Sequence, residues 1–538
     1  MKTHVFLRIT ALFVTFAVIV SVMSACGEDT DNSPSMIDGS YYYDPDQLPE
    51  IEYNELRLPY SKSDSLDPLS AKSSMNRQLT TLLYDSLFSI GETYEPVPLI
   101  ANSYTADHLS VSVTINSGVY FTDGSQMTTN DVVYSFEKAS QSSVYSSRLS
   151  NFESATATGL NSVLFMLKQP DPYAAACLDF PIIKTGTSLD DLKKINESLA
   201  QDEKDSMKKN VHKTVPTGSG RYKLVYEENE ADPSLIAHNQ RFGGFFPEIN
   251  SIKLVNITDS DALFYSLEIG NISFAFDDLS SGVYTRVSAN TAEYPLNNFV
   301  YVGLNQDDPA LANYSIRTAI ARAIDRENIL NIAFQGHAQA TYTPFNPLWN
   351  PIIEYTPQNT YSREEAKSIL EKAGYNQINS YGYRNNGRLS LTFTMIVCEG
   401  NNFKLTAAEQ IAKNLKSLDI NVDIRVMPQD AFLDAVELGK FDMYIGEVSL
   451  LPNMSLDAFF CGEGRMAHGI WARSAADAYY AFLSGEGTIE EFMIAFEKEV
   501  PFIPLCFRNG IAAGVKELNN STEARFYDLF EDIDRWKF

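Results

Sequence analysis

The alternation of hydrophobic and polar positions is most regular in the last third of the chain, where it predicts strands and helices in turn. Alternating runs predict strands at 389–397, 420–427 and 441–448, and apolar residues at helical spacing predict helices at 403–418 and 431–438. This order is typical of a doubly wound α/β layer, whose ligands bind beyond the carboxyl ends of the strands.

Two segments follow strand ends of this layer and are therefore candidate walls of a binding crevice. "CEGNN" follows the first strand, and "SLLPNMSLDAFF" follows the third. The second segment is unusual for a loop because it is apolar and carries almost no charge, whereas solvated loops are rich in small polar residues. We expect it to face a crevice and not water.

The front half of the chain has a different pattern. It predicts a strand at 51–58, a leucine-rich helix near 79–87, several short strands, and a helix that begins at the capping pair Thr128 and Asp131. Such a mixed α+β pattern predicts a lobe separate from the α/β layer, which begins near residue 299 and ends before residue 504.

The N-terminus predicts export from the cytoplasm. Basic residues precede an apolar run at 9–22, and Met23-Ser24-Ala25-Cys26 resembles the lipobox of bacterial lipoproteins, in which the cysteine thiol is acylated. We predict a lipoprotein signal peptide at 1–25, lipidation of Cys26, and an acidic flexible tether at 26–47. The protein would then be anchored to the extracytoplasmic side of the cell membrane; the alternative is an ordinary signal peptide with an incidental cysteine.

Composition and charge narrow the choice of partners. The 538 residues exceed what one core holds, and 44% of them are hydrophobic. A formal net charge of -27 argues against nucleic acid as a partner. The histidines and cysteines lack metal-ligand spacing, so no metal or cofactor is expected. The cysteines other than Cys26 do not determine a disulfide pairing, although 177 and 506 lie in apolar surroundings typical of buried thiols.

Several segments in the same order resemble one protein family. They are "SLDPL" at 65–69, "LTTLLYDSLF" at 79–88, "INSGVYFTDGSQMTTNDVVYSFEKA" at 115–139, "PTGSGRYKL" at 216–224, "VGLNQ" around 305, "IRTAIARAIDRENI" at 316–329 and "EAKSILEKAGY" at 365–375. Together they resemble the bacterial extracellular solute-binding proteins of family 5, the dipeptide- and oligopeptide-binding lipoproteins of ABC importers. The resemblance covers roughly residues 50–515.

The resemblance implies an α/β fold of the type II periplasmic-binding-protein kind, with two lobes and a ligand cleft between them. Lobe I would comprise 48–298, with an extra subdomain at about 76–211, and would resume at 505–538; lobe II would comprise 299–504. Closure of the lobes on a peptide would precede delivery to an ABC permease with a separate ATPase. A monomer is expected.

The resemblance also implies where the ligand would lie. In peptide-binding relatives an aspartate in the loop after the third strand pairs with the ligand's α-amine, but no carboxylate stands near Pro452. Either Glu447 substitutes for it or the ligand lacks a charged amine, and Tyr222 and Asn305 are equally consistent with ligand contact and with scaffold. The candidate ligand-binding residues are Ser70, Ala71, Tyr222, Asn305, Glu399, Asn401, Glu447, Ser449, Leu451, Pro452, Met454 and Phe459.

Other functions have less support in the sequence. No nucleophile elbow, metal triad, Cys/His pair or phosphate loop is recognisable, so an extracellular hydrolase is disfavoured and the chain is not expected to be an enzyme. A solute other than a peptide remains an alternative, such as a metal chelate or an oligosaccharide that stacks on Trp349 or Trp471. So does a sensor that presents its ligand to a receptor.

Overall fold

The computed structural model of the chain describes residues 36–37, 40–41, 55–198, 215–226, 232–258, 262–280, 289–462, 464–520 and 525–538. It comprises two compact units, Met1–Glu52 and Tyr53–Phe538. In the first unit, β1 (Met36–Ile37) and β2 (Ser40–Tyr41) form an antiparallel pair. The predicted signal peptide, Cys26 and the rest of the predicted tether lie outside the described residues.

In the second unit we call residues 55–298 and 505–538 lobe I, following the predicted boundaries. One four-stranded sheet has the order β10-β11-β12-β3, a second has the order β6-β7-β9-β8, and β4 pairs with β5. The elements are β3 (Leu56–Tyr60), α2 (Ser74–Leu83), β4 (Phe88–Ile90), β5 (Pro96–Pro98), β6 (Ala101–Ala106), β7 (Ser110–Ile115), α3 (Thr129–Gln141), β8 (Phe152–Ala157), β9 (Ser162–Leu167), η2 (Ala174–Cys177), α4 (Leu189–Ser198), β10 (Tyr222–Val225), β11 (Ser234–Ala237), β12 (Ser251–Asn256), α6 (Ala262–Glu268), β13 (Phe274–Asp277) and η5 (Ile533–Arg535).

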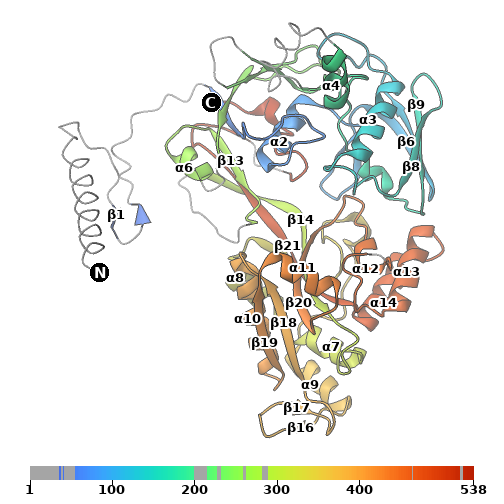
Figure 1. Cartoon of the computed structure of the whole chain (residues 1–538), viewed down its shortest axis with the longest axis vertical. Helices are drawn as coiled ribbons and strands as arrows, with labels where there is room; N and C mark the ends of the chain where they lie inside the picture. Colours follow the sequence, from blue (N-terminus) through green and yellow to red (C-terminus); the bar gives the residue numbers. More distant parts are fainter. Residues whose placement is uncertain are drawn as a thin grey trace, which may run out of the picture. The chain divides into compact units, whose positions relative to one another are not determined.

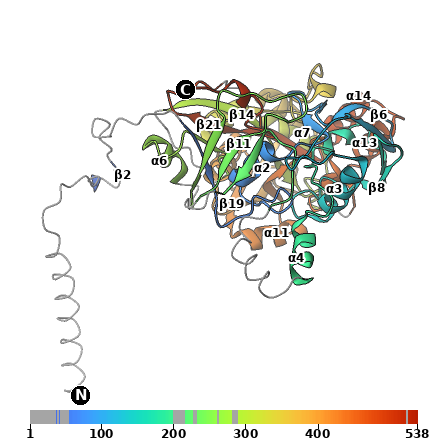
Figure 2. The same ribbon diagram turned by 90° about the horizontal axis from the view of Figure 1, so that it is seen from above.

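Residues 299–504 are called lobe II, and two long strands connect it to lobe I (Figure 1). These are β14 (Asn290–Leu304) and β21 (Phe502–Gly514), which pair antiparallel and run side by side in Figure 2. The other elements are α7 (Tyr314–Ala323), α8 (Arg326–Ala333), β15 (Ala338–Ala340), η4 (Asn350–Ile352), α9 (Arg363–Lys372), β16 (Gln377–Ile378), β17 (Arg384–Asn385), β18 (Thr392–Cys398), α10 (Asn402–Lys416), β19 (Asn421–Met427), α11 (Gln429–Glu437), β20 (Met443–Ser449), α12 (Asp457–Phe460), α13 (Arg473–Ser484) and α14 (Ile489–Glu499).

The predicted α/β layer is present in lobe II. Its strands belong to a sheet of order β13-β21-β14-β20-β18-β19, which extends into lobe I through β13, and β15 also pairs with β21. Strand β18 pairs parallel with both β19 and β20. Because β19 and β20 lie on opposite sides of β18, the crossover helices α10 and α11 cover opposite faces. Side chains alternate accordingly: Met395 and Val397 join the core under α10, whereas Ile396 joins the aromatic core under α11.

Local sequence signals explain where several helices begin. Thr128 and Asp131 form the predicted capping box of α3, and Asp325 accepts a hydrogen bond from the N–H of Asn328 at the start of α8. Helix α11 begins two residues earlier than predicted, directly after Pro428. Proline's fixed φ suits entry into a helix, so the periodicity alone placed this boundary too late.

The sequence pattern of the C-terminal tail, residues 525–538, predicts an amphipathic segment on the surface, but Leu529, Phe530, Ile533 and Trp536 are buried in lobe I. Trp536 lies against Phe274, with ring centroids 4.9 Å apart, and its Nε1 donates to Asp532 Oδ1 at 3.0 Å. The tail thus completes the core of the first lobe. Among the residues that the structure describes, no helix is both long and apolar enough to cross a membrane.

The burial of Trp536 yields a test of this arrangement. Trp536→Ala should lower the free energy of unfolding by about 3–5 kcal/mol, because it removes a buried aromatic ring from a packed core. Urea denaturation measures the change, and Phe538→Ala, at a position 39% exposed, should shift it by less than about 0.5 kcal/mol. Equal effects of the two substitutions would show that the tail is not part of the core.

Candidate functional site

The carboxyl end of β20 has one edge without a strand partner among the described residues. On one side β20 pairs with β14 from Met443 to Ser449, but on the other side β18 pairs with it only at Met443 and Tyr444. The N–H of Leu450 donates to the carbonyl of Asn297 at 2.9 Å. In an antiparallel ladder hydrogen-bonded pairs alternate, so the backbone groups of Glu447 and Ser449 point away from β14. They form a short free strand edge.

The side chain of Glu447 lies beside this edge in a buried charge network. Its side chain is only 10% exposed; Arg508 Nε lies 2.7 Å from Oε1, and Lys404 Nζ lies 2.7 Å from Oε2. Asn298 Nδ2 also donates to Oε1 at 2.9 Å. Burial by itself would raise the pKa of Glu447, but Arg508 and Lys404 lower it to about 2. Both carboxylate oxygens are thus occupied, which argues against the hypothesis that Glu447 holds a ligand amine.

The same network connects the two lobes. Arg508 donates to the carbonyl of Asp278, at the end of β13, and Asn401 Nδ2 donates to the carbonyl of Ser280 at 2.9 Å. Asn401 also caps α10 by accepting a hydrogen bond from the N–H of Lys404. One candidate ligand residue, Asn401, therefore serves helix capping and the contact between the lobes.

The apolar loop after β20 is covered by protein. Met454, Leu456 and Phe459 are buried in the aromatic core with Phe299 and Phe502. The expectation that this loop faces a crevice is therefore not met for these side chains. Within the loop, Ser449 and Leu451 retain exposure, and Pro452 is buried.

Polar contacts hold this loop against lobe I. Asn453 Nδ2 donates to Asp171 Oδ2 at 2.6 Å, and Asn297 Nδ2 donates to the carbonyl of Leu450 at 2.8 Å. Burial raises the pKa of Asp171 to about 6, in spite of the hydrogen bond from Asn453. The loop therefore contacts lobe I, whereas the sequence predicted that it would face an open cleft.

Most of the remaining candidate residues have contacts within the protein. Tyr222 is buried and donates to the carbonyl of Ile249 at 2.7 Å, and Asn305 Nδ2 donates to the carbonyl of Phe441 at 2.9 Å, so both have scaffold contacts. Ser70 Oγ donates to Asp67 Oδ2 at 2.7 Å beside the buried Ala71, and Glu399 is exposed at the end of β18. None of these five residues lines either of the two cavities described below.

Sequence reasoning missed the cations of the network, although each carries a signal. Lys404 lies in the first turn of α10, where the helix dipole disfavours a positive charge unless an acid is near. Arg508 interrupts the apolar run of β21, and a buried arginine requires a partner. Neither signal identifies the partner, because the acid comes from a third element.

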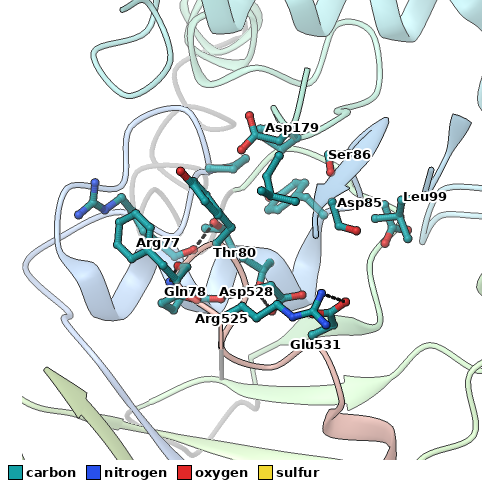
Figure 3. Close-up of a pocket in the computed structure, with 18 of the residues that line it drawn as sticks. Arg77, Gln78, Thr80, Asp85, Ser86, Leu99, Asp179, Arg525, Asp528 and Glu531 are labelled. Atoms are coloured by element: carbon teal, nitrogen blue, oxygen red, sulfur yellow. Dashed lines mark hydrogen bonds and ion pairs between the residues drawn. The ribbon is translucent and has the colours of Figure 1, made fainter. Parts of the chain in front are cut away.

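A cavity of about 450 Å³ lies in lobe I (Figure 3). Ion pairs line it: Arg241 with Asp85 at 2.7 Å, Arg221 with Asp528 at 2.5 Å, Arg525 with Glu531 at 3.1 Å, and Arg148 with Asp179. Its walls come from segments far apart in sequence, including α2, the C-terminal tail and residues next to the crossing strands. No local sequence pattern indicates such a site, so the sequence did not predict this cavity.

A second cavity, of about 1100 Å³, lies in lobe II between α11 and the described residues of 459–476. Trp471 lines it, is 70% exposed, and donates from Nε1 to Asp307 Oδ1 at 2.8 Å. Trp349, the other tryptophan considered for stacking on sugars, is buried against Phe345 and Tyr173. In the described part of the chain, no three His, Cys, Asp or Glu side chains are arranged to hold a metal ion.

The four described cysteines have free thiols. Cys177 and Cys506 are buried, as expected from their apolar surroundings, whereas Cys461 is exposed and Cys398 is half-buried. Burial raises the pKa of Cys177 and of Cys506, which keeps both in the unreactive thiol form.

Comparison with known proteins adds a family match. Residues 95–461 match the bacterial extracellular solute-binding proteins, family 5 Middle. The oligopeptide-binding protein AppA of Bacillus subtilis is 26% identical over 343 residues, which cover 62% of this chain and 61% of AppA. The chain thus matches about three fifths of the length of such curated relatives.

Solved structures share the fold over most of the chain. AppA from Bacillus subtilis in complex with a nonapeptide has a TM-score of 0.56 at 22% identity, covering 90% of this chain and 98% of that one. The unliganded open form of the periplasmic murein tripeptide binding protein MppA has a TM-score of 0.68 at 16% identity, covering 89% and 97%. These likenesses confirm the predicted two-lobe α/β fold.

The charge network gives a second test. Glu447→Gln should lower the free energy of unfolding by about 3–5 kcal/mol, because it leaves the buried Arg508 without its anion. The folded-state pKa of Glu447 is lowered from 4.5 to about 2, so the difference from wild type should be full above pH 4.5 and shrink as the pH falls toward 2. Urea denaturation across this pH range measures it.

The matched control is Glu399→Gln, which removes the same charge from an exposed position at the end of β18. This substitution should change the free energy of unfolding by no more than about 0.5 kcal/mol. A loss at Glu447 no larger than the loss at Glu399 would contradict a structural role for the network.

Proposed function

The chain belongs to the bacterial extracellular solute-binding proteins of family 5, and on that premise we propose that it captures a peptide outside the cell. The peptide binds in extended form where the two lobes meet. The loaded protein then delivers it to the permease of an ABC importer, whose ATPase is a separate chain. The chain itself performs no chemistry, in keeping with relatives whose names describe binding proteins.

The free edge of β20 is the observation that carries this proposal. An extended peptide added beside Glu447 and Ser449 makes main-chain hydrogen bonds with their outward-facing backbone groups. Such bonds do not depend on ligand side chains, so one site accepts many sequences. The edge is short, and further contacts must therefore come from lobe I.

Closure of the lobes about β14 and β21 completes the capture. The two strands pair from Asn290 to Gly303, with register shifts between Pro295 and Phe299 and between Val300 and Tyr301. Irregular pairing of this kind bends a strand and provides a position for hinge motion. Ligand stabilises the closed form by its higher affinity for it.

Membrane anchoring through Cys26 keeps the protein near its permease. Its support is the lipobox-like sequence at 23–26 and the acidic segment that follows. This anchor distinguishes a tethered receptor from one that diffuses into the medium.

The strand edge is tested by a single substitution and its control. Ser449→Pro removes the outward N–H and should weaken the binding of a synthetic pool of three- to nine-residue peptides by about 1 kcal/mol or more, roughly fivefold in Kd. Ser449→Ala keeps the backbone and should bind as wild type does. Native mass spectrometry and isothermal titration measure both. Unchanged affinity in Ser449→Pro would exclude the edge, and a wild type that binds no peptide would exclude peptides as the solute.

Anchoring is tested independently of ligand. Cys26→Ser should move the protein from the detergent-extractable membrane fraction to the medium, or leave an unprocessed precursor, because the acylated thiol is lost. Immunoblots of fractionated cells and mass spectrometry of the mature N-terminus distinguish these results. Mature protein that stays in the membrane fraction in Cys26→Ser would refute the anchor.

A further inference from the structure

The lobe II cavity is lined by a tryptophan side chain that is exposed and yet held in place. Trp471 lines this cavity and is 70% exposed. Its Nε1 donates to Asp307 Oδ1 at 2.8 Å, and its backbone N–H donates to Gln306 Oε1 at 3.1 Å. Burial of aromatic surface is favourable, so an exposed ring that is fixed by its polar edge is suited to pack against a ligand.

The segment that carries Trp471 packs closely against the turn after β14. The N–H of Gln306 donates to the carbonyl of Gly469 at 2.9 Å. Gly469 has a φ of +74°, and a Cβ atom at this position would lie only 2.7 Å from Asn305 Oδ1. Glycine is required there both for the backbone conformation and for the close approach. Hydrogen bonds and backbone packing together therefore fix the position of Trp471.

The charged side chains around this cavity have both signs. Helix α11 contributes carboxylates at helical spacing, and the segment on the other side contributes guanidinium groups: Asp430, Asp434, Glu437, Arg465 and Arg473. Within the described part of the chain, only Arg473 of these five is in an ion pair, with Asp477 at 3.7 Å. A cationic ligand would meet the arginines, and an anionic ligand would meet the carboxylates. A neutral ligand whose groups both donate and accept hydrogen bonds avoids both conflicts.

Apolar side chains complete the cavity wall and leave room for several rings. Leu433 is 47% exposed, and Phe459, Met466 and Ile470 also line the cavity. The volume of about 1100 Å³ slightly exceeds the ~300–1,000 Å³ that is typical of small-molecule sites. A sugar ring combines an apolar face with a rim of hydroxyl groups. It therefore matches an aromatic ring that lies beside carboxylates and guanidinium groups.

Trp471 lies away from the free strand edge of β20. It bonds to the turn that follows β14, and the N–H of Asn305 in that turn donates to the carbonyl of Asp442, directly before β20 begins. The free edge is at Glu447 and Ser449, near the other end of the same strand. The Trp471 end of the cavity is therefore separate from the proposed peptide contact.

We propose that the lobe II cavity binds a neutral oligosaccharide, with Trp471 as the surface on which one sugar ring stacks. The carboxylates of α11 accept hydrogen bonds from sugar hydroxyls, and Arg465 donates hydrogen bonds to other hydroxyls. This inference does not depend on peptide capture. It assigns a second class of ligand to a different part of lobe II.

Tryptophan fluorescence reports on this site directly, because the other two tryptophans of the chain are buried. Trp349 and Trp536 are 2% and 1% exposed, so acrylamide quenching of the native protein arises mainly from Trp471. The probes are the neutral trisaccharides cellotriose and N,N′,N″-triacetylchitotriose, with trigalacturonate as the anionic control and trilysine as the cationic control. A neutral trisaccharide should protect Trp471 from acrylamide in a saturable way, whereas the two charged controls should not.

Isothermal titration then compares Trp471→Ala, Trp471→Phe and Tyr381→Ala. Tyr381 is 80% exposed and does not line the cavity, so its removal is the matched control for the loss of an exposed ring. Trp471→Ala should weaken binding of the protecting trisaccharide by about tenfold or more, as truncation of a central aromatic contact does. Trp471→Phe should retain part of the affinity because a ring remains, and Tyr381→Ala should bind as wild type does. Circular dichroism and melting temperature establish that each variant is folded.

Several results would overturn the proposal. They are a wild type that neither trisaccharide protects, an affinity that is unchanged in Trp471→Ala, and equal protection by trilysine or trigalacturonate. If Trp471→Ala does not fold, acrylamide protection of wild type decides, since it needs no variant.

Peptide binding separates this proposal from the proposed peptide capture. The pool of three- to nine-residue peptides should bind Trp471→Ala as it binds wild type, and a loss of peptide binding in this variant would contradict a separate site. A wild type that binds no peptide but is protected by a trisaccharide would refute peptide capture and support the oligosaccharide site.

Discussion

Glu447 is the carboxylate on which the junction of the two lobes depends. Transfer of this group from water is costly, and the cost is offset only while Arg508 and Lys404 both lie 2.7 Å from its oxygens. The three residues come from β20, β21 and α10, and Arg508 also donates to the end of β13 in lobe I. The network therefore fixes the carboxyl end of β20 relative to the crossing strands, and with it the only backbone edge that the proposed ligand uses.

A second set of contacts also joins the two lobes. Asn453 bonds the buried Asp171, Tyr173 packs on Trp349 with ring centroids 4.9 Å apart, and His108 Nδ1 lies 3.1 Å from the carbonyl of Leu483. All three join the extra subdomain of lobe I to lobe II. The proposed closure about β14 and β21 must break these contacts or carry residues 76–211 along. The apolar loop after β20 is thus explained by contact between the lobes, and its lack of charge follows from burial.

The sequence predicted the α/β layer well because its periodicity is local: β18, α10, β19, α11 and β20 each alternate or repeat on their own. It predicted the site poorly because charge pairing is not local. The sequence correctly placed Glu447 near a strand end. Its partners, Lys404 and Arg508, lie 43 positions before it and 61 positions after it in the chain. The lobe I cavity combines Arg148, Asp179 and Asp528, which no periodic pattern connects. Burial of the tail was missed because its apolar face resembles that of a surface element.

A free strand edge has consequences for how the proposed peptide is recognised. Such an edge binds peptides of any sequence but permits sliding by two residues, because its donors and acceptors repeat. Pairing with the backbone of Glu447 and Ser449 therefore does not set the register of the peptide by itself. The carboxylate of Glu447 does not set it either, because both of its oxygens lie in ion pairs with Arg508 and Lys404. The register of a bound peptide must therefore come from contacts outside this edge.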